Sequence, residues 1–167
     1  GFCYYACMLV FIAFFALGAV VASFVGVVSG RMNTGQGFVG GHSRCDACNT
    51  VLAPTALIPV ISYFIFSGRA NCCDARISVL APLTELLLGF LFALSYFTFG
   101  LTLPLAPFLL SISLLLALVL YDFAHQILPP LLLYPFVITS AVTGFFLSPS
   151  ISDFFNTIII AISICAF

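Results

Sequence analysis

The sequence predicts an all-α polytopic membrane protein, from its abundance of apolar residues and the placement of its few charges. Of the 167 residues, 63% are hydrophobic and 5% are charged. A soluble domain of this size could not cover its surface with so few polar groups. All four arginines lie between residues 31 and 76, and no basic patch elsewhere indicates a nucleic-acid partner. We expect about five transmembrane helices, with a cysteine-containing loop after the first.

Residues 1–30 are expected to form the first transmembrane helix. Residues 2–28 contain no charged side chain, and this run exceeds the roughly 20 residues that an α-helix needs to cross a bilayer. The chain begins without the basic residues of a signal peptide, so we expect the helix to be retained. Small residues recur at every fourth position, and such a stripe favours close packing against another helix in lipid. They are Gly18, Ala22, Gly26 and Gly30.

Four further apolar segments follow the loop, and clusters of glycine, proline and serine separate them as turns. They lie near residues 79–99, 104–121, 131–147 and 154–167. The last would cover about 21 Å of a hydrocarbon core about 30 Å thick. We therefore expect residues 79–167 to form an incomplete membrane domain, with a truncated last helix and its carboxy-terminal part missing.

The loop of residues 31–78 predicts the orientation of the helices. Its arginines are Arg31, Arg44, Arg69 and Arg76. Positively charged loops stay on the cytoplasmic side, so we expect the loop in the cytoplasm and the amino terminus outside. Counting spans then places Asp122 at the cytoplasmic membrane face and Asp153 at the outer face.

Four cysteines in this loop form a candidate metal site: Cys45, Cys48, Cys72 and Cys73. The loop is too small to build a hydrophobic core, and a structural metal would stabilise it. A Cys-x-x-Cys pair followed by a second cysteine pair is typical of zinc ribbons, and reducing cytoplasm favours zinc over disulfides.

The adjacency of Cys72 and Cys73 leaves the ligand set open. Adjacent cysteines rarely both reach one ion, so Cys73 is the better candidate, with Cys72, Asp74 or a water completing the shell. A disulfide or free thiols are the alternatives to a metal. Three other cysteines lie in apolar segments and are expected to be small packing residues. These are Cys3, Cys7 and Cys165.

Asp122 is the candidate catalytic residue, with His125 three residues on and on the same helix face. An ionisable group at the membrane edge favours a function, although a charge reaching the interface would also explain it. Carboxylates that activate water work in pairs. Glu85 is a candidate partner across a helix interface, and a hydrogen bond from Glu85 to the loop or neighbouring helices is the structural alternative. Asp153 is expected to start a helix.

A set of motifs occurs along the chain in a definite order. The motifs are Ala22-Ser-Phe-Val-Gly-Val-Val, Ser43-Arg-Cys45-Asp-Ala-Cys48, Ile58-Pro-Val-Ile-Ser62-Tyr, Gly68-Arg69, Cys73, Ile77-Ser78, Pro82-Leu-Thr-Glu85-Leu and Asp122-Phe-Ala-His125-Gln-Ile-Leu-Pro129. This ordered set resembles the bacterial type IV prepilin peptidases, in register from about residue 18 to residue 150.

The resemblance implies an inner-membrane aspartic peptidase that removes the leader of type IV prepilins or pseudopilins, which serve type IV pili and type II secretion. It also implies methylation of the new amino terminus with S-adenosylmethionine, and zinc in the cysteine loop. Asp122 matches one catalytic aspartate of the family, and the other lies in a Gly-x-Gly-Asp motif that the 167 residues lack. We therefore expect this chain alone to be inactive as a peptidase.

One departure from the family pattern concerns the metal site, because the pattern would place a cysteine at Ala70. A non-catalytic zinc-loop membrane scaffold or assembly factor is the alternative function. A small transporter or channel fits less well, because the spans contain few polar residues. The bilayer is an expected partner in either case.

Overall fold

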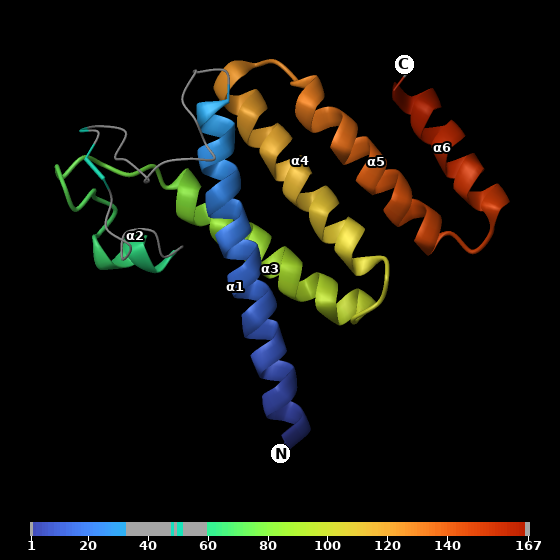
Figure 1. The fold of residues 1–167 in the computed structure, drawn as a ribbon, viewed down its shortest axis with the longest axis horizontal. Coiled ribbons are helices and arrows are strands. Elements are labelled where there is room, and N and C mark those ends of the chain that lie inside the picture. The colour runs from blue at the N-terminus through green and yellow to red at the C-terminus, as the bar shows by residue number, and fades with distance from the viewer. Residues whose placement is uncertain (1, 33–47, 49, 52–59, 166–167) are drawn as a thin grey trace.

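The computed structural model describes residues 2–32, 48, 50–51 and 60–165. Its helices are α1 (Phe2–Arg31), α2 (Ile61–Ile65), α3 (Leu80–Phe99), α4 (Leu105–His125), α5 (Pro130–Leu147) and α6 (Ile151–Cys165) (Figure 1). The described residues contain no β-strand, and an isolated antiparallel bridge joins Arg69 to Arg76. The all-α prediction is confirmed, and α1, α3, α4 and α5 are long and apolar enough to cross a membrane.

The helix boundaries lie close to those expected from the sequence. Prolines explain much of this agreement, because Pro82, Pro107 and Pro130 lie in the first turns of α3, α4 and α5, where a missing N–H costs no helical hydrogen bond. The helix expected over 154–167 begins at Ile151 and has 15 residues, which span about 22 Å.

The third span differs most from its expected range, since α4 continues one turn past residue 121 to His125. Gln126 then adopts the left-handed conformation and donates its N–H to the carbonyl of Asp122, a common way to end a helix. Asp122 therefore lies inside the last turn of α4, with its backbone position determined by helical hydrogen bonds.

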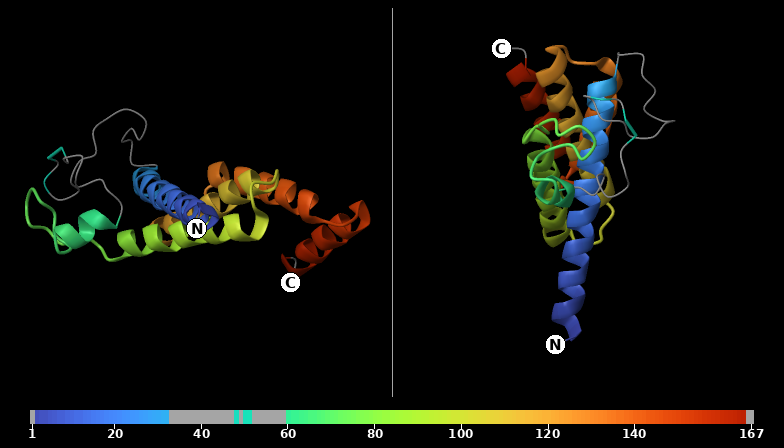
Figure 2. Two further views of the ribbon diagram at one scale, coloured as in Figure 1. Left: turned by 90° about the horizontal axis from the view of Figure 1, so that it is seen from below. Right: turned by 90° about the vertical axis from the view of Figure 1, so that its left-hand side faces the viewer.

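The helices form a bundle in which α1 crosses α3 and also packs along α4, and α5 runs antiparallel to α4 (Figures 1 and 2). The core lies among α1, α3 and α4, and its buried residues are Ala22 of α1 and Leu88 and Phe92 of α3. In contrast, Thr143 is the one buried residue of α5. Helix α6 contacts α5, where the rings of Phe145 and Phe154 lie 5.7 Å apart.

Two glycines allow the close crossing of α1 and α3. A Cβ at Gly18 would lie 2.6 Å from the carbonyl oxygen of Leu88 and 2.9 Å from the Cα of Gly89, and a Cβ at Gly89 would lie 2.9 Å from the ring of Phe15. The two backbones thus touch without intervening side chains. This is the close approach that small residues permit between helices in lipid.

The predicted small-residue stripe is confirmed in its first half and wrong in its second. Gly18 and Ala22 are buried, whereas a Cβ at Gly26 or Gly30 would meet open space. Positions four apart drift by about 40° around a helix of 3.6 residues per turn, so a strict fourfold repeat leaves the interface. One buried row instead alternates steps of four and three, with Ala19 buried beside it: Gly18, Ala22, Val25, Ser29 and Met32.

Hydroxyl groups join α4 to its neighbours within the apolar bundle. The buried Ser29 hydroxyl donates to the carbonyl of Ala117 on α4 at 3.3 Å. The hydroxyls of Ser111 and Ser140 lie 2.6 Å apart and link α4 to α5. Such bonds contribute about 1 kcal/mol each in membrane bundles. They set the register of α4 against both helices.

Replacing Gly18 with alanine is expected to lower the free energy of unfolding by about 1–3 kcal/mol, because the new methyl group must push the α3 backbone away. Gly26→Ala, on the same helix but facing open space, should be neutral or stabilising by up to about 1 kcal/mol. Reversible unfolding in mixed detergent micelles measures both. Equal stabilities for the two variants would contradict the proposed role of the crossing.

Candidate functional site

The candidate functional residues occupy the side of the bundle where α1 ends and α3 begins. The carboxyl ends of α1 and α4 and the amino ends of α3 and α5 all lie toward this side, and α2 lies beside the first turns of α3 (Figures 1 and 2). The sequence expectation placed the loop and Asp122 on one membrane face, and this arrangement agrees with it.

A tight hairpin of residues 68–77 carries two of the cysteines. The N–H of Ile77 donates to the carbonyl of Gly68, and the N–H of Ala70 donates to that of Ala75, both at 2.8 Å. Gly68 has a φ of 70°, and a Cβ there would lie 2.9 Å from the hydroxyl of Tyr63. Both facts require glycine at this position. The hairpin therefore presents Cys72 and Cys73 at its turn.

Three thiols converge at this turn. The Sγ of Cys48 lies 3.2 Å from that of Cys72, the Sγ atoms of Cys72 and Cys73 lie 3.9 Å apart, and all three atoms lie within 4.8 Å of one another. Zn–S bonds of about 2.3 Å place tetrahedral sulfur ligands about 3.8 Å apart. The three thiols therefore fit around one zinc ion.

Electrostatics at Cys48 also favour metal binding. Hydrogen bonds to the side chain and backbone of Thr50, and a weaker one to Cys72, lower the pKa of the Cys48 thiol to about 6. At neutral pH this cysteine is therefore largely a thiolate, which is the form that binds metals.

The structure brings both adjacent cysteines into the cluster, although the sequence favoured Cys73 alone. Cys45 lies outside the described residues. Asp74, considered as a further ligand, instead forms an ion pair with Arg69. Ala70, where the resemblance would place a cysteine, is buried at the base of the hairpin turn, and its carbonyl accepts the N–H groups of Cys73 and Asp74.

Glu85 of α3 points to the loop. Its Oε2 accepts the N–H of Val60 at 2.6 Å, and the residue is buried. Val60 immediately precedes α2 and has a positive φ of 59°. This is the structural alternative considered for Glu85, a hydrogen bond to the loop. A buried carboxylate with this partner anchors α2 against α3.

Asp122 and His125 share the last turn of α4 but differ in their surroundings. The Asp122 side chain is exposed, whereas the ring of His125 lies 4.4 Å from the ring of the buried Tyr121. The Nε2 atom of His125 is buried and has no hydrogen-bond partner among the described residues. Tyr121 and His125 are four residues apart, a spacing from which the contact could have been anticipated.

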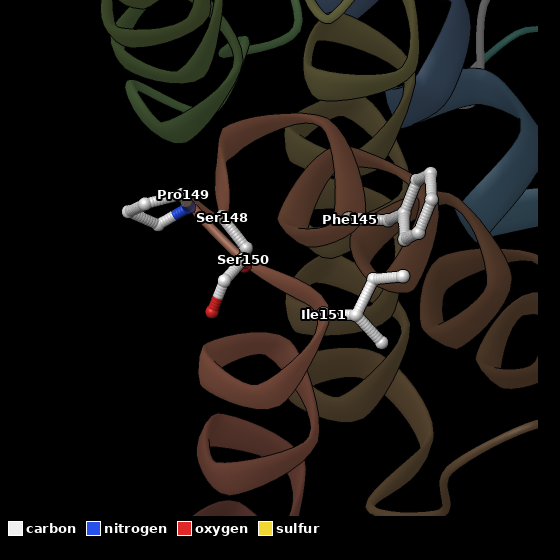
Figure 3. Close-up of a pocket in the computed structure, with 5 residues that line it drawn as sticks. All are labelled: Phe145, Ser148, Pro149, Ser150 and Ile151. Atoms are coloured by element: carbon white, nitrogen blue, oxygen red, sulfur yellow. The ribbon is translucent and has the colours of Figure 1, made fainter.

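Asp153 lies at the other end of the bundle, as expected for a helix-start residue. Its N–H donates to the Ser150 hydroxyl, which donates in turn to the Asp153 carboxylate at 2.6 Å. A hollow of about 160 Å³ lies beside this turn, lined by Phe145, Ser148, Pro149, Ser150 and Ile151 (Figure 3). It is smaller than the roughly 300 Å³ at which ligand pockets begin.

A family model of the bacterial peptidase A24 N-terminal domain matches residues 16–99, which run from the Gly18 crossing through the thiol hairpin to the end of α3. The chain belongs to this family. The prediction from the ordered motifs is thereby confirmed at the level of the family. Asp122 lies beyond the matched residues, so its role remains a prediction.

Curated relatives carry the name prepilin leader peptidase/N-methyltransferase. The chain is 43% identical over 115 residues to one from Myxococcus xanthus, which covers 69% of this chain and 34% of the relative. It is 31% identical to one from Bacillus subtilis over 69% of this chain and 46% of the relative, and 36% identical to one from Stutzerimonas stutzeri over 56% and 32%. The chain thus spans from about a third to just under a half of their length. No solved structure matches it.

Removing the Glu85 carboxylate should release α2 from α3. In Glu85→Ala the N–H of Val60 loses its acceptor, so amide exchange over residues 60–66 should speed up by about tenfold, equivalent to a bond of about 1.5 kcal/mol. Glu85→Gln keeps an acceptor oxygen and should show a smaller change. Hydrogen-exchange mass spectrometry of the detergent-solubilised protein measures both. Unchanged exchange in Glu85→Ala would show that other contacts hold α2.

Proposed function

We propose that this protein acts as a membrane aspartic endopeptidase that removes the leader peptide of type IV prepilins or pseudopilins. Membership of the peptidase A24 family carries this proposal, and the names of its relatives support the substrate class. Its place would be the bacterial inner membrane, with the amino terminus outside and the cysteine loop in the cytoplasm. The arginines of the loop support this orientation.

Asp122 is proposed as one of two aspartates that activate the attacking water. Its exposure at the end of α4, on the same side as the loop, makes it accessible to a peptide that approaches from that side. An unprotonated carboxylate would accept a proton from water while a protonated partner donates to the leaving amine. Glu85 is engaged by Val60, so we assign the partner to the family's Gly-x-Gly-Asp motif, and the 167-residue chain alone is expected not to cleave.

Methylation of the new amino terminus is proposed from the names of the relatives, with S-adenosylmethionine as the methyl donor. The described residues suggest no residue for this cofactor. Cleavage and methylation would act on the same substrate at the same membrane face.

Zinc is proposed as a structural metal ion that stabilises the loop. Its proposed ligands are Cys48, Cys72 and Cys73, with Cys45 as the fourth. The three converging thiols support this assignment. Bound zinc would hold the hairpin to the preceding segment of the loop, which has too few apolar residues to form a core. The metal would have a structural role.

In the protein as its gene encodes it, Asp122→Asn should reduce prepilin cleavage by about a thousandfold or more, because the amide cannot accept a proton from water. Asp153→Asn is the matched control, since Asp153 lies in the first turn of α6, where its N–H donates to the Ser150 hydroxyl, at the opposite end of the bundle. Cleavage is measured from the mobility shift of a purified prepilin in proteoliposomes. Cleavage by Asp122→Asn at the rate of the control would remove Asp122 from the mechanism.

The protein purified under reducing conditions should contain about one zinc per chain, as a four-thiolate site implies. Cys48→Ser and Cys72→Ser should each lose most of this metal, whereas Cys7→Ser, in α1 and away from the cluster, should retain it. Inductively coupled plasma mass spectrometry measures the metal. A zinc content that does not depend on Cys48 and Cys72 would contradict the assignment.

The alternative is a non-catalytic membrane scaffold or assembly factor that keeps the zinc loop. It is favoured by one observation, that Glu85, the nearest candidate partner for Asp122 in the sequence interpretation, is bonded to the loop. The two functions differ in the Asp122→Asn experiment: a scaffold would support pilus assembly as well with this variant as without it.

A further inference from the structure

Helix α2 exposes an apolar face on the side of the bundle that carries the arginines. Ile61, Phe64 and Ile65 are 55%, 70% and 63% exposed. Their spacing of three and four residues places them on one face of the helix. Tyr63, on another face, contacts Gly68 of the hairpin. The packing of α2 on the protein therefore uses Tyr63 and leaves the most apolar face outward.

The depth of α2 follows from the bond between Val60 and Glu85. Glu85 is the sixth residue of α3, so its Cα lies about 8 Å along the helix from the first residue. Because α3 is long and apolar enough to span a membrane, the start of α2 is held level with the second turn of a spanning helix. A segment at this level lies near the boundary between headgroups and acyl chains, about 5–10 Å deep.

Two exposed arginines follow α2 in the chain. The hairpin that follows α2 places Arg69 and Arg76 opposite each other in an antiparallel bridge, and both are exposed. Arg69 also pairs with Asp74. An exposed apolar helix face followed in the chain by exposed arginines is typical of segments that lie on membranes with anionic headgroups.

We propose that α2 and the hairpin of residues 68–77 form a membrane-docking element, with Ile61, Phe64 and Ile65 inserted at the headgroup boundary of an anionic leaflet. We infer that lipid covers this apolar face because α2 is fixed to a membrane-spanning helix at that depth. The thiol hairpin is thereby held against the membrane at two points, through Glu85 and through lipid. The inference does not depend on the proposed peptidase activity.

The chain contains no tryptophan, so Phe64→Trp introduces a single fluorescent reporter at an exposed position. In proteoliposomes that contain anionic lipid, we expect blue-shifted emission. Lipids brominated near the headgroup end of the acyl chain should quench it about twofold or more, as for a side chain at the boundary. Asn71→Trp, at the exposed hairpin turn and not among the inserted side chains, is the control and should be quenched less by bromine than Phe64→Trp.

Two further measurements keep the test specific. Ile65→Asp in the Phe64→Trp background should reduce the quenching, because a carboxylate next to the reporter opposes insertion. Replacing anionic by zwitterionic lipid should also reduce it, and equal quenching in both would overturn the role assigned to the arginines. Water-like emission from Trp at position 64 would overturn the proposal. Blue-shifted emission without bromine quenching would overturn it as well, since another protein surface would then cover α2.

Discussion

The direct contact between the backbones of α1 and α3 at Gly18 and Gly89 is the constraint on which the remaining geometry depends. These two helices flank the loop, so their crossing determines where the loop leaves the membrane and where it returns. Glu85 is four residues before Gly89 and therefore lies on the same face of α3, one turn nearer the loop. The residue that anchors α2 is thus placed by the glycine contact, because a wider separation of the helices would move Glu85 relative to the end of α1.

The position of Asp122 follows from a second step. Ser29, near the carboxyl end of α1, donates to Ala117 of α4, and Asp122 is five residues further along α4, about 7.5 Å. Contacts with α1 therefore determine the positions of both candidate sites. The thiol hairpin is placed through α3 and Glu85, and the Asp122 carboxylate is placed through α4. This common reference explains how an exposed aspartate at a helix end and a cysteine hairpin can keep a defined relation without contacting each other.

The membrane helices could be predicted from the sequence because their lengths follow from the bilayer thickness and their first turns are marked by prolines. Both signals can be read from neighbouring residues. The contacts between elements could not. A fourfold repeat of small residues does not tell which of Gly18 and Gly26 meets another helix, since that depends on the crossing point. The bond from Val60 to Glu85 depends on a positive φ that no residue preference indicates at valine. The convergence of Cys48 with Cys72 and Cys73 follows the Cys-x-x-Cys pattern, but the inclusion of both adjacent cysteines depends on the shape of the hairpin turn. The place of Cys45 stays a prediction.

The uneven burial of the helices bears on how Asp122 is presented. Helices α1, α3 and α4 share a packed core, whereas α5 buries one residue, Thr143, although it packs along α4 and is joined to it by the serine pair Ser111 and Ser140. Asp122 and His125 lie on the last turn of α4, just before the chain turns into α5. The backbone of Asp122 is therefore held by a helix of the packed core, while its side chain is exposed next to the least buried of the four helices that could span a membrane.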